Sequence, residues 1–109
     1  MKNNLFYLNH IGEAVANIEK FLGDIDYDGF QANTMMVNAV IKELEIIGEA
    51  ANNIGREFRV LHPEIPWDKM IDMRNFLIHE YFGIRTDVVW DTAKNDLPEL
   101  KSALKPLLD

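Results

Sequence analysis

The chain has 109 residues, of which 48% are hydrophobic and 27% charged, and this length and composition predict one folded domain over residues 1–109. Its net charge of −7 weighs against non-specific binding to nucleic acid or to an anionic membrane. It contains no cysteine, which excludes disulfides and cysteine-ligated metal, and no apolar run near the roughly 20 residues of a membrane span. Because the N-terminal residues lack the continuous apolar core of a signal peptide, we expect a cytoplasmic protein.

The first half of the chain shows helical periodicity, with apolar residues at spacings of three and four. The first stripe, which we expect to end at Gly23, consists of Leu5, Leu8, Ile11, Val15, Ile18 and Phe21. The second predicts one long helix from about Phe30 to Leu61, with a seam of the bundle or coiled-coil type. That seam consists of Val40, Leu44, Ile47, Ala51, Ile54, Phe58 and Leu61.

The segment between these two helices resembles the start of a calcium loop. Asp24, Asp26, Asp28 and Gly29 give the pattern D-x-D-x-D-G of an EF-hand. The twelfth position should then be a bidentate glutamate, but it is Met35. We therefore prefer the alternative to a calcium loop. It is a polar turn whose acidic residues lie at a helix N-terminus, where the helix dipole favours them.

Two prolines in HPEIPW, residues 62–67, separate the second helix from a third. Pro66 suits the first helical position, and the third helix is expected from about Trp67 to Phe82. Gly83 is expected to end it.

Two further signals mark the C-terminal part of the chain. Thr86 can cap a fourth helix, and Asp96 before Leu97-Pro98 predicts a kink or restart. No segment alternates with period two for long enough to form a strand. The predicted fold is therefore all-α, an up-and-down bundle of four to five helices.

The third helix carries unusual polar residues. In MRNFLIHEYFG, residues 73–83, four polar groups fall within eight positions of a helix that should be buried. On a helical wheel, Met70, Met73 and Leu77 form a core stripe, whereas Arg74 and His79 differ by about 140° and about 7.5 Å of rise. Arg74 and His79 could both reach into a groove where this helix meets another surface.

These residue types suit cleavage of a phosphodiester. Histidine can take a proton from a ribose 2′-hydroxyl, and arginine can hold a phosphate and stabilise charge that grows on its oxygens. Asn75 could orient the His79 ring or bind the substrate. All four arginines lie between residues 56 and 85, around this helix. No metal is required for such a reaction.

Structural explanations remain open for each of these residues. A single histidine in a bundle helix is more often structural than catalytic. Arg74 could pair with Glu49, Asp72 or Glu80, and Tyr81 could be a half-buried packing residue.

The ordered set of motifs resembles the HEPN superfamily, and within it the HepT-like toxins. Arg74 to Tyr81 reproduces the R-x4-H-x-Y motif. The surrounding sequence is also similar over nearly the whole chain: IGEAANNI at 47–54, HPEIPW at 62–67, Val89-Trp90 and DLPEL at 96–100.

The resemblance implies a small helical bundle that forms a homodimer and acts as a metal-independent ribonuclease without a cofactor. It implies that Arg74, Asn75 and His79, from two protomers, form a composite catalytic site on RNA. It further implies an MntA-like nucleotidyltransferase antitoxin as partner, which would add AMP to Tyr81. A second function remains open, a non-catalytic subunit that binds nucleotide or substrate for a nucleotidyltransferase.

Overall fold

The computed structural model describes residues 3–80 and 83–108, and this part of the chain is helical without any β-strand. The four long helices are α1 (Asn4–Leu22), α3 (Thr34–Asn53), α5 (Trp67–His79) and α7 (Leu97–Leu108). The short elements between them are α2 (Tyr27–Ala32), α4 (Arg56–Leu61), α6 (Thr86–Asp91) and a π-helical segment, η1 (Thr92–Asp96). The predicted all-α class is confirmed.

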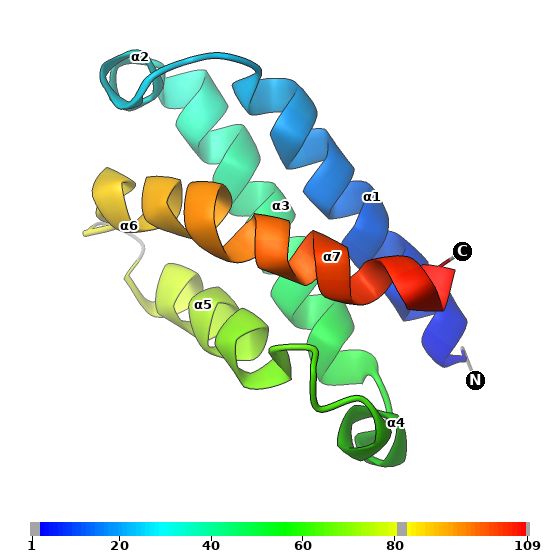
Figure 1. The fold of residues 1–109 in the computed structure, drawn as a ribbon. Helices are drawn as coiled ribbons and strands as arrows, with labels where there is room; N and C mark the ends of the chain where they lie inside the picture. The colour runs from blue at the N-terminus through cyan, green and yellow to red at the C-terminus, as the bar shows by residue number, and fades with distance from the viewer. Residues whose placement is uncertain (1–2, 81–82, 109) are drawn as a thin grey trace.

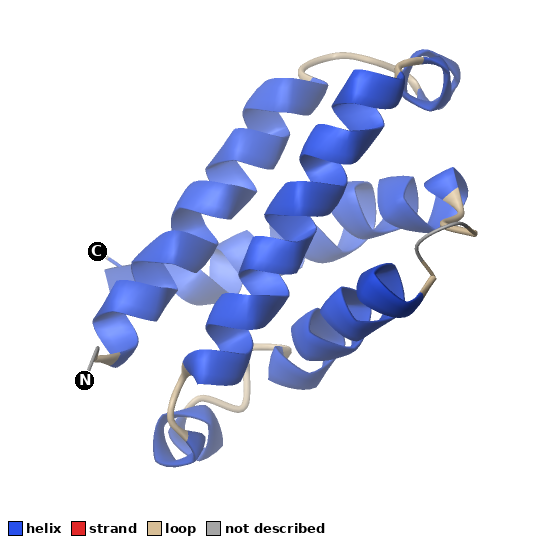
Figure 2. Cartoon of the chain, turned by 180° about the vertical axis from the view of Figure 1, so that it is seen from behind, coloured by secondary structure: helices blue, strands red, loops and turns tan. Residues whose placement is uncertain are grey.

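The helices form two layers. α1 packs along α3, and α3 packs along α5, so these three helices lie side by side. The α6–η1–α7 segment crosses one face of this layer, as Figure 1 shows, whereas Figure 2 shows the opposite face without a covering helix. The core is mostly aliphatic, with Phe30 and Trp67 also buried. Its most deeply buried aliphatic side chains include Ile11, Ile18, Val40, Ile47, Leu77, Leu100 and Leu104.

The predicted long helix from Phe30 to Leu61 is wrong, because the chain breaks it at two places. Asn33 has an extended backbone and ends α2, and its side-chain oxygen accepts from Met36 N at 3.0 Å to begin α3. Ile54 is extended as well, and Gly55 N donates to Asn4 Oδ1 at 3.0 Å. Such side-chain to backbone bonds compete with helical hydrogen bonds, so they interrupt the helix although the apolar spacing continues through it.

Three predicted helix boundaries also differ from the structure. α5 ends at His79, with Glu80 as its C-cap, and not near Phe82. Pro66 precedes the first helical residue. Thr86 is the first residue of α6 and not its N-cap, and its hydroxyl lies 3.1 Å from the Tyr27 hydroxyl and shares a hydrogen bond with it.

The remaining sequence signals have structural counterparts. Gly23 ends α1 with a φ of 49°, a conformation that glycine adopts easily. Asp26 caps α2 by accepting from Gly29 N at 2.8 Å, so the D-x-D-x-D-G stretch already turns into helix at Tyr27. The kink or restart predicted near Asp96 coincides with the end of the π-helical segment, although the backbone stays helical through Leu97. Within the described ranges, no helix is long and apolar enough to cross a membrane.

Candidate active site

Arg74 is positioned by a close approach between α3 and α5. Gly48 of α3 is buried, and a Cβ built on it would lie 2.7 Å from the Met70 carbonyl oxygen. The same Cβ would collide with the Cβ of Arg74. The absence of a side chain at Gly48 therefore lets the two backbones pack closely, which brings the Arg74 side chain across α3.

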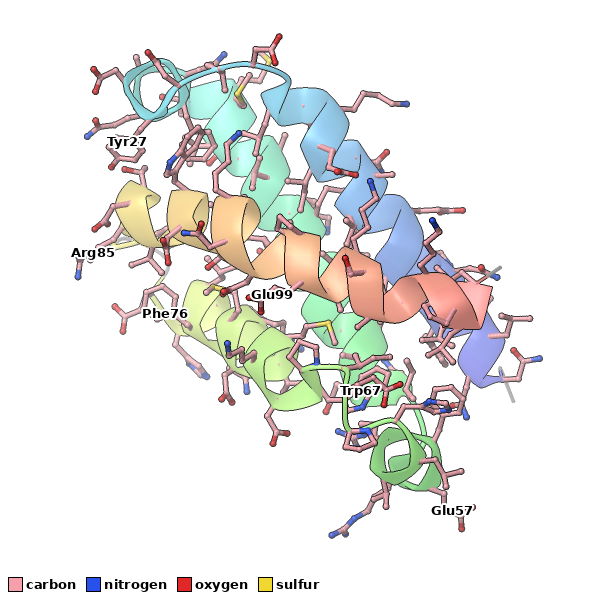
Figure 3. All side chains as sticks on the ribbon, in the orientation of Figure 1. Tyr27, Glu57, Trp67, Phe76, Arg85 and Glu99 are labelled. Atoms are coloured by element: carbon pink, nitrogen blue, oxygen red, sulfur yellow. The ribbon has the colours of Figure 1, made fainter. Side chains whose placement is uncertain are left out.

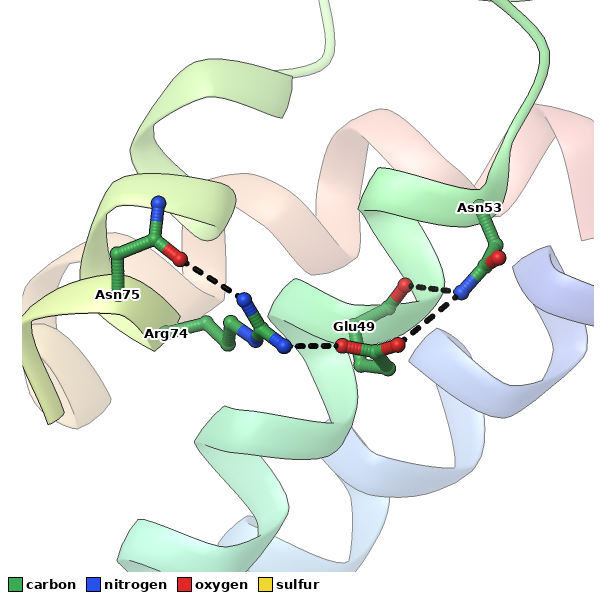
Figure 4. A network of polar contacts seen from close by, with 4 residues as sticks. All are labelled: Glu49, Asn53, Arg74 and Asn75. Atoms are coloured by element: carbon green, nitrogen blue, oxygen red, sulfur yellow. Dashed lines mark hydrogen bonds and ion pairs between the residues drawn. The ribbon is translucent and has the colours of Figure 1, made fainter. Parts of the chain in front are cut away.

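Arg74 is held in a chain of polar contacts between the two helices, shown in Figure 4. Its Nη2 lies 2.8 Å from Glu49 Oε2, and its Nη1 donates to Asn75 Oδ1 at 2.9 Å. Asn53 Nδ2 donates to the Glu49 carbonyl oxygen at 2.9 Å and makes a longer contact of 3.5 Å with Glu49 Oε1. The side chain of Arg74 is 30% exposed, so the guanidinium is oriented and still open to solvent.

A groove of about 450 Å³ lies beside this network, and we call it the Arg74 groove. Polar residues from α3 and α5 line it, namely Lys42, Glu45, Glu49, Asn53 and Arg74. Its other lining residues come from α1, α3 and α5: Phe6, Tyr7, His10, Ile46, Ala50 and Ile78. The groove thus lies over the layer of α1, α3 and α5.

His79 does not line the Arg74 groove. It is exposed at the last residue of α5, turned by about 140° from Arg74 as helix geometry requires. Asn75 is half-buried and bonded to Arg74, so in this structure it orients the arginine and not the histidine. Tyr81 lies outside the described residues.

The other expectations for α5 can be compared with the packing. Met70 and Leu77 are buried and Met73 is half-buried, which confirms the core stripe. Of the three carboxylates considered as partners for Arg74, the structure selects Glu49.

His10 and Lys42 are among the groove residues that sequence reasoning missed. His10 comes from α1, where its ring packs against Phe6 with centroids 4.5 Å apart, and Lys42 comes from α3. The local sequence offers one indication of His10, its spacing of four from Phe6, which places both rings on one face of the helix. The sequence near His10 does not indicate that this face lies beside Arg74, because residues of α1 and α5 line the same groove only in the tertiary structure.

The arrangement can bind an anion and position it. The partly exposed guanidinium of Arg74 can form two parallel hydrogen bonds to a phosphate. The phosphate would then compete with Glu49 for the guanidinium. His10 lines the same groove, and imidazole is the side chain that most often transfers protons in catalysis. Among the described residues, no three histidine or acidic side chains come together in the manner of a metal site.

Comparison with known proteins identifies the family. The model of the family described as "Ribonuclease HepT-like" matches residues 11–107. "Probable ribonuclease HepT" of Thermococcus cleftensis is 48% identical, over 93% of this chain and 92% of its own. A protein named "Putative RNase" from Methanocaldococcus jannaschii is 42% identical, over 91% of each chain.

A protein from Caldanaerobacter subterraneus that is also named "Putative RNase" is 36% identical, over 99% of this chain and 96% of its own. No solved structure matches the chain. The family match spans α5 with its Arg74 and His79 and nearly all of the bundle around them. The chain therefore belongs to the HepT-like ribonuclease family.

Proposed function

We propose that this member of the family is a metal-independent endoribonuclease whose catalytic site forms between two copies of the chain. The observation that carries the proposal is the separation of Arg74 from His79 on α5. Arg74 lies in a groove on the layer of α1, α3 and α5, and His79 lies outside that groove. A second copy that packs on this layer would bring its own His79 toward Arg74.

The exposed apolar residues support a homodimer of this kind. Ile78 is 45% exposed and Phe6 is 37% exposed, and both line the Arg74 groove. A small domain that leaves large apolar side chains on one face gains stability by covering them. We expect a dimer in sedimentation at tens of micromolar, and Ile78→Asp should dissociate it. A monomeric parent protein would contradict the proposal.

The reaction follows from the residue types. His79 of one protomer accepts the proton of a ribose 2′-hydroxyl, and the 2′-oxygen attacks the adjacent phosphorus. The P–O5′ bond breaks, and the leaving 5′-oxygen takes a proton from water, so the products are a cyclic 2′,3′-phosphate and a 5′-hydroxyl. The protonated His79 then returns its proton to solvent. Arg74 holds the phosphate and stabilises its added charge, and Asn75 orients Arg74.

The test is cleavage of RNA by purified variants in the presence of a chelator. His79→Ala should slow cleavage about 10²-fold or more, as loss of a general acid–base group does. Arg74→Lys should also be slow, because an ammonium lacks the planar fork of a guanidinium. His62→Ala is the matched histidine variant and should keep activity, because His62 does not line the Arg74 groove. If His10→Ala loses activity and His79→Ala keeps it, the proton transfer belongs to His10. Intact RNA together with nucleotide binding would favour the non-catalytic subunit.

We further propose that the chain is the toxin of a toxin–antitoxin pair. Its partner would be an MntA-like nucleotidyltransferase that adds AMP to Tyr81. The family resemblance supports this, as does the position of Tyr81 two residues beyond the exposed His79. An AMP phosphate near the site could pair with Arg74 and exclude RNA.

Co-expression with the neighbouring nucleotidyltransferase, followed by intact mass and peptide mapping, tests the modification. A gain of adenylyl groups on Tyr81 that is absent in Tyr81→Phe is expected. Tyr7 and Tyr27 are internal controls, since the Tyr27 hydroxyl is already hydrogen-bonded to Thr86. Modification found only at these two tyrosines would contradict the proposal.

A further inference from the structure

Two of the four arginines of this chain form ion pairs with a carboxylate in the described structure, and two do not. Arg74 contacts Glu49, and Arg85 contacts Asp87 with distances of 2.6 and 3.2 Å. The Arg85–Asp87 hydrogen bonds raise the pKa of the guanidinium and lower the pKa of the carboxyl group. Arg56 and Arg59 of α4 form no ion pair with any described residue. Their charge is therefore available to a ligand.

Both of these α4 arginines line a second groove, which we call the α4 groove. It has a volume of about 700 Å³ and lies between α4, the α4–α5 connection and the first residues of α5. Lys69 lines it as a third cation, and Asp68 is the single carboxylate among the described residues that line it. In a chain with a net charge of −7, this local excess of positive charge is unusual. It indicates an anionic ligand.

The environment of Arg59 strengthens this indication. Its Nε is buried and has no hydrogen-bond acceptor in the described part of the chain, while the residue as a whole is half-buried. A charged group that is partly removed from water interacts more strongly with an opposite charge than a fully hydrated one does. Figure 3 shows Glu57 on the opposite side of α4 from Trp67, and Trp67 lines the groove whereas Glu57 does not.

The position of the groove connects it with the Arg74 groove. Lys69 precedes Arg74 by five residues on α5, which corresponds to about 7.5 Å of rise and a rotation of about 140°. Asn53 of the Arg74 groove likewise precedes Arg56 of the α4 groove by three residues, so the two grooves are neighbours along the chain at two places. The two grooves can thus contact successive parts of one extended polymer.

We propose that the α4 groove binds the phosphodiester backbone of single-stranded RNA, at a site separate from the bond that is cleaved. This rests on the proposed ribonuclease function. Arginine is the side chain best suited to phosphate, and two arginines with a lysine over two elements suit a chain of phosphates better than one compact anion. The described residues that line the groove offer cations and no histidine, so its contribution is to affinity and not to the chemical step.

Binding of an uncleavable RNA tests the inference separately from cleavage. The probe is a fluorescently labelled 2′-O-methyl RNA, which lacks the 2′-hydroxyl nucleophile, and the readout is fluorescence anisotropy at several salt concentrations. Arg56→Gln/Arg59→Gln should weaken binding about tenfold or more at about 0.1 M salt, where exposed charges still attract phosphates. The slope of log K against log salt should fall by about 1.4, since each contact with single strands contributes about 0.7.

Matched controls distinguish a site from a general effect of charge. Lys20→Gln/Lys105→Gln removes the same charge from exposed residues that do not line the α4 groove and should bind as the parent does. If it weakens binding equally, or if the arginine variant binds normally, the inference is overturned. If the double arginine variant fails to fold, the exposed pair Arg56→Gln and Lys69→Gln takes its place.

The proposed function can fail independently. A parent protein that does not cleave unmodified RNA contradicts the ribonuclease proposal, even where the α4 groove binds the probe. If the parent cleaves RNA and the arginine variant cleaves a long RNA and a dinucleotide at parental rates, the α4 groove has no role. A loss confined to the long substrate is the expected result.

Discussion

Gly48→Ala places a methyl group at a close contact between α3 and α5. Alanine is favoured over glycine inside a helix by about 1 kcal/mol, so propensity alone predicts a more stable protein. The new Cβ, however, would lie 2.7 Å from the Met70 carbonyl oxygen and still closer to the Arg74 Cβ. Both neighbours belong to, or are attached directly to, the backbone of α5, so rotation of a side chain cannot relieve the contact.

The expected magnitude follows from these two opposing effects. Overpacking of a closely packed site costs about 1–3 kcal/mol, and this rigid contact belongs near the upper end. After the gain in propensity, we expect a net loss of about 1–2 kcal/mol in the free energy of unfolding. For a domain of this size, that lowers Tm by about 4–15 °C. The displaced α5 should also lengthen the Arg74–Glu49 contact of 2.8 Å.

Thermal and urea unfolding of Gly48→Ala and Gly12→Ala provide the comparison. Gly12 lies on α1, and its built Cβ would be 2.9 Å from Leu108 Cδ1, the end of a flexible side chain near the C-terminus. Gly12→Ala should therefore be neutral or stabilising by up to about 1 kcal/mol. If Gly48→Ala is as stable as Gly12→Ala, then the close contact does not determine the position of α5.

Three further outcomes can be measured on the same protein. Leu77→Ala should lower the free energy of unfolding by about 2–5 kcal/mol in urea titrations, because Leu77 is only 1% exposed in the core. Asn33→Ala removes the cap of α3 and should cost about 1 kcal/mol by thermal unfolding; an unchanged Tm would show that the break there has another cause. Glu49→Gln should change stability by less than about 1 kcal/mol, because the pair is partly exposed. It should also bind uncleavable RNA more tightly than the parent at low salt, since Arg74 loses its competing carboxylate; weaker binding would contradict this role for Glu49.

The sequence by itself determined the helical class, the core stripe of α5 and the family. Helical spacing is a local property. The predicted stripe of α1 is buried from Leu8 to Ile18, whereas its two end residues, Leu5 and Phe21, are exposed. The R-x4-H-x-Y motif and the sequence around it indicate the HepT-like family, and the family match over residues 11–107 confirms it. The same motif contains Arg74, which lies in a groove of the folded chain.

The tertiary structure decided where helices break and which residues meet. Asn4 binds Gly55 across 51 positions of sequence, so the end of α3 depends on a contact that no local pattern contains. Glu49 is one of three possible partners for Arg74, and only the packing of α3 against α5 selects it. His10 reaches the Arg74 groove from α1. Arg74 and Arg85 form ion pairs and the two arginines of the α4 groove do not, a difference that only the structure reveals. These features depend on distances between elements, which periodicity and motif spacing do not specify.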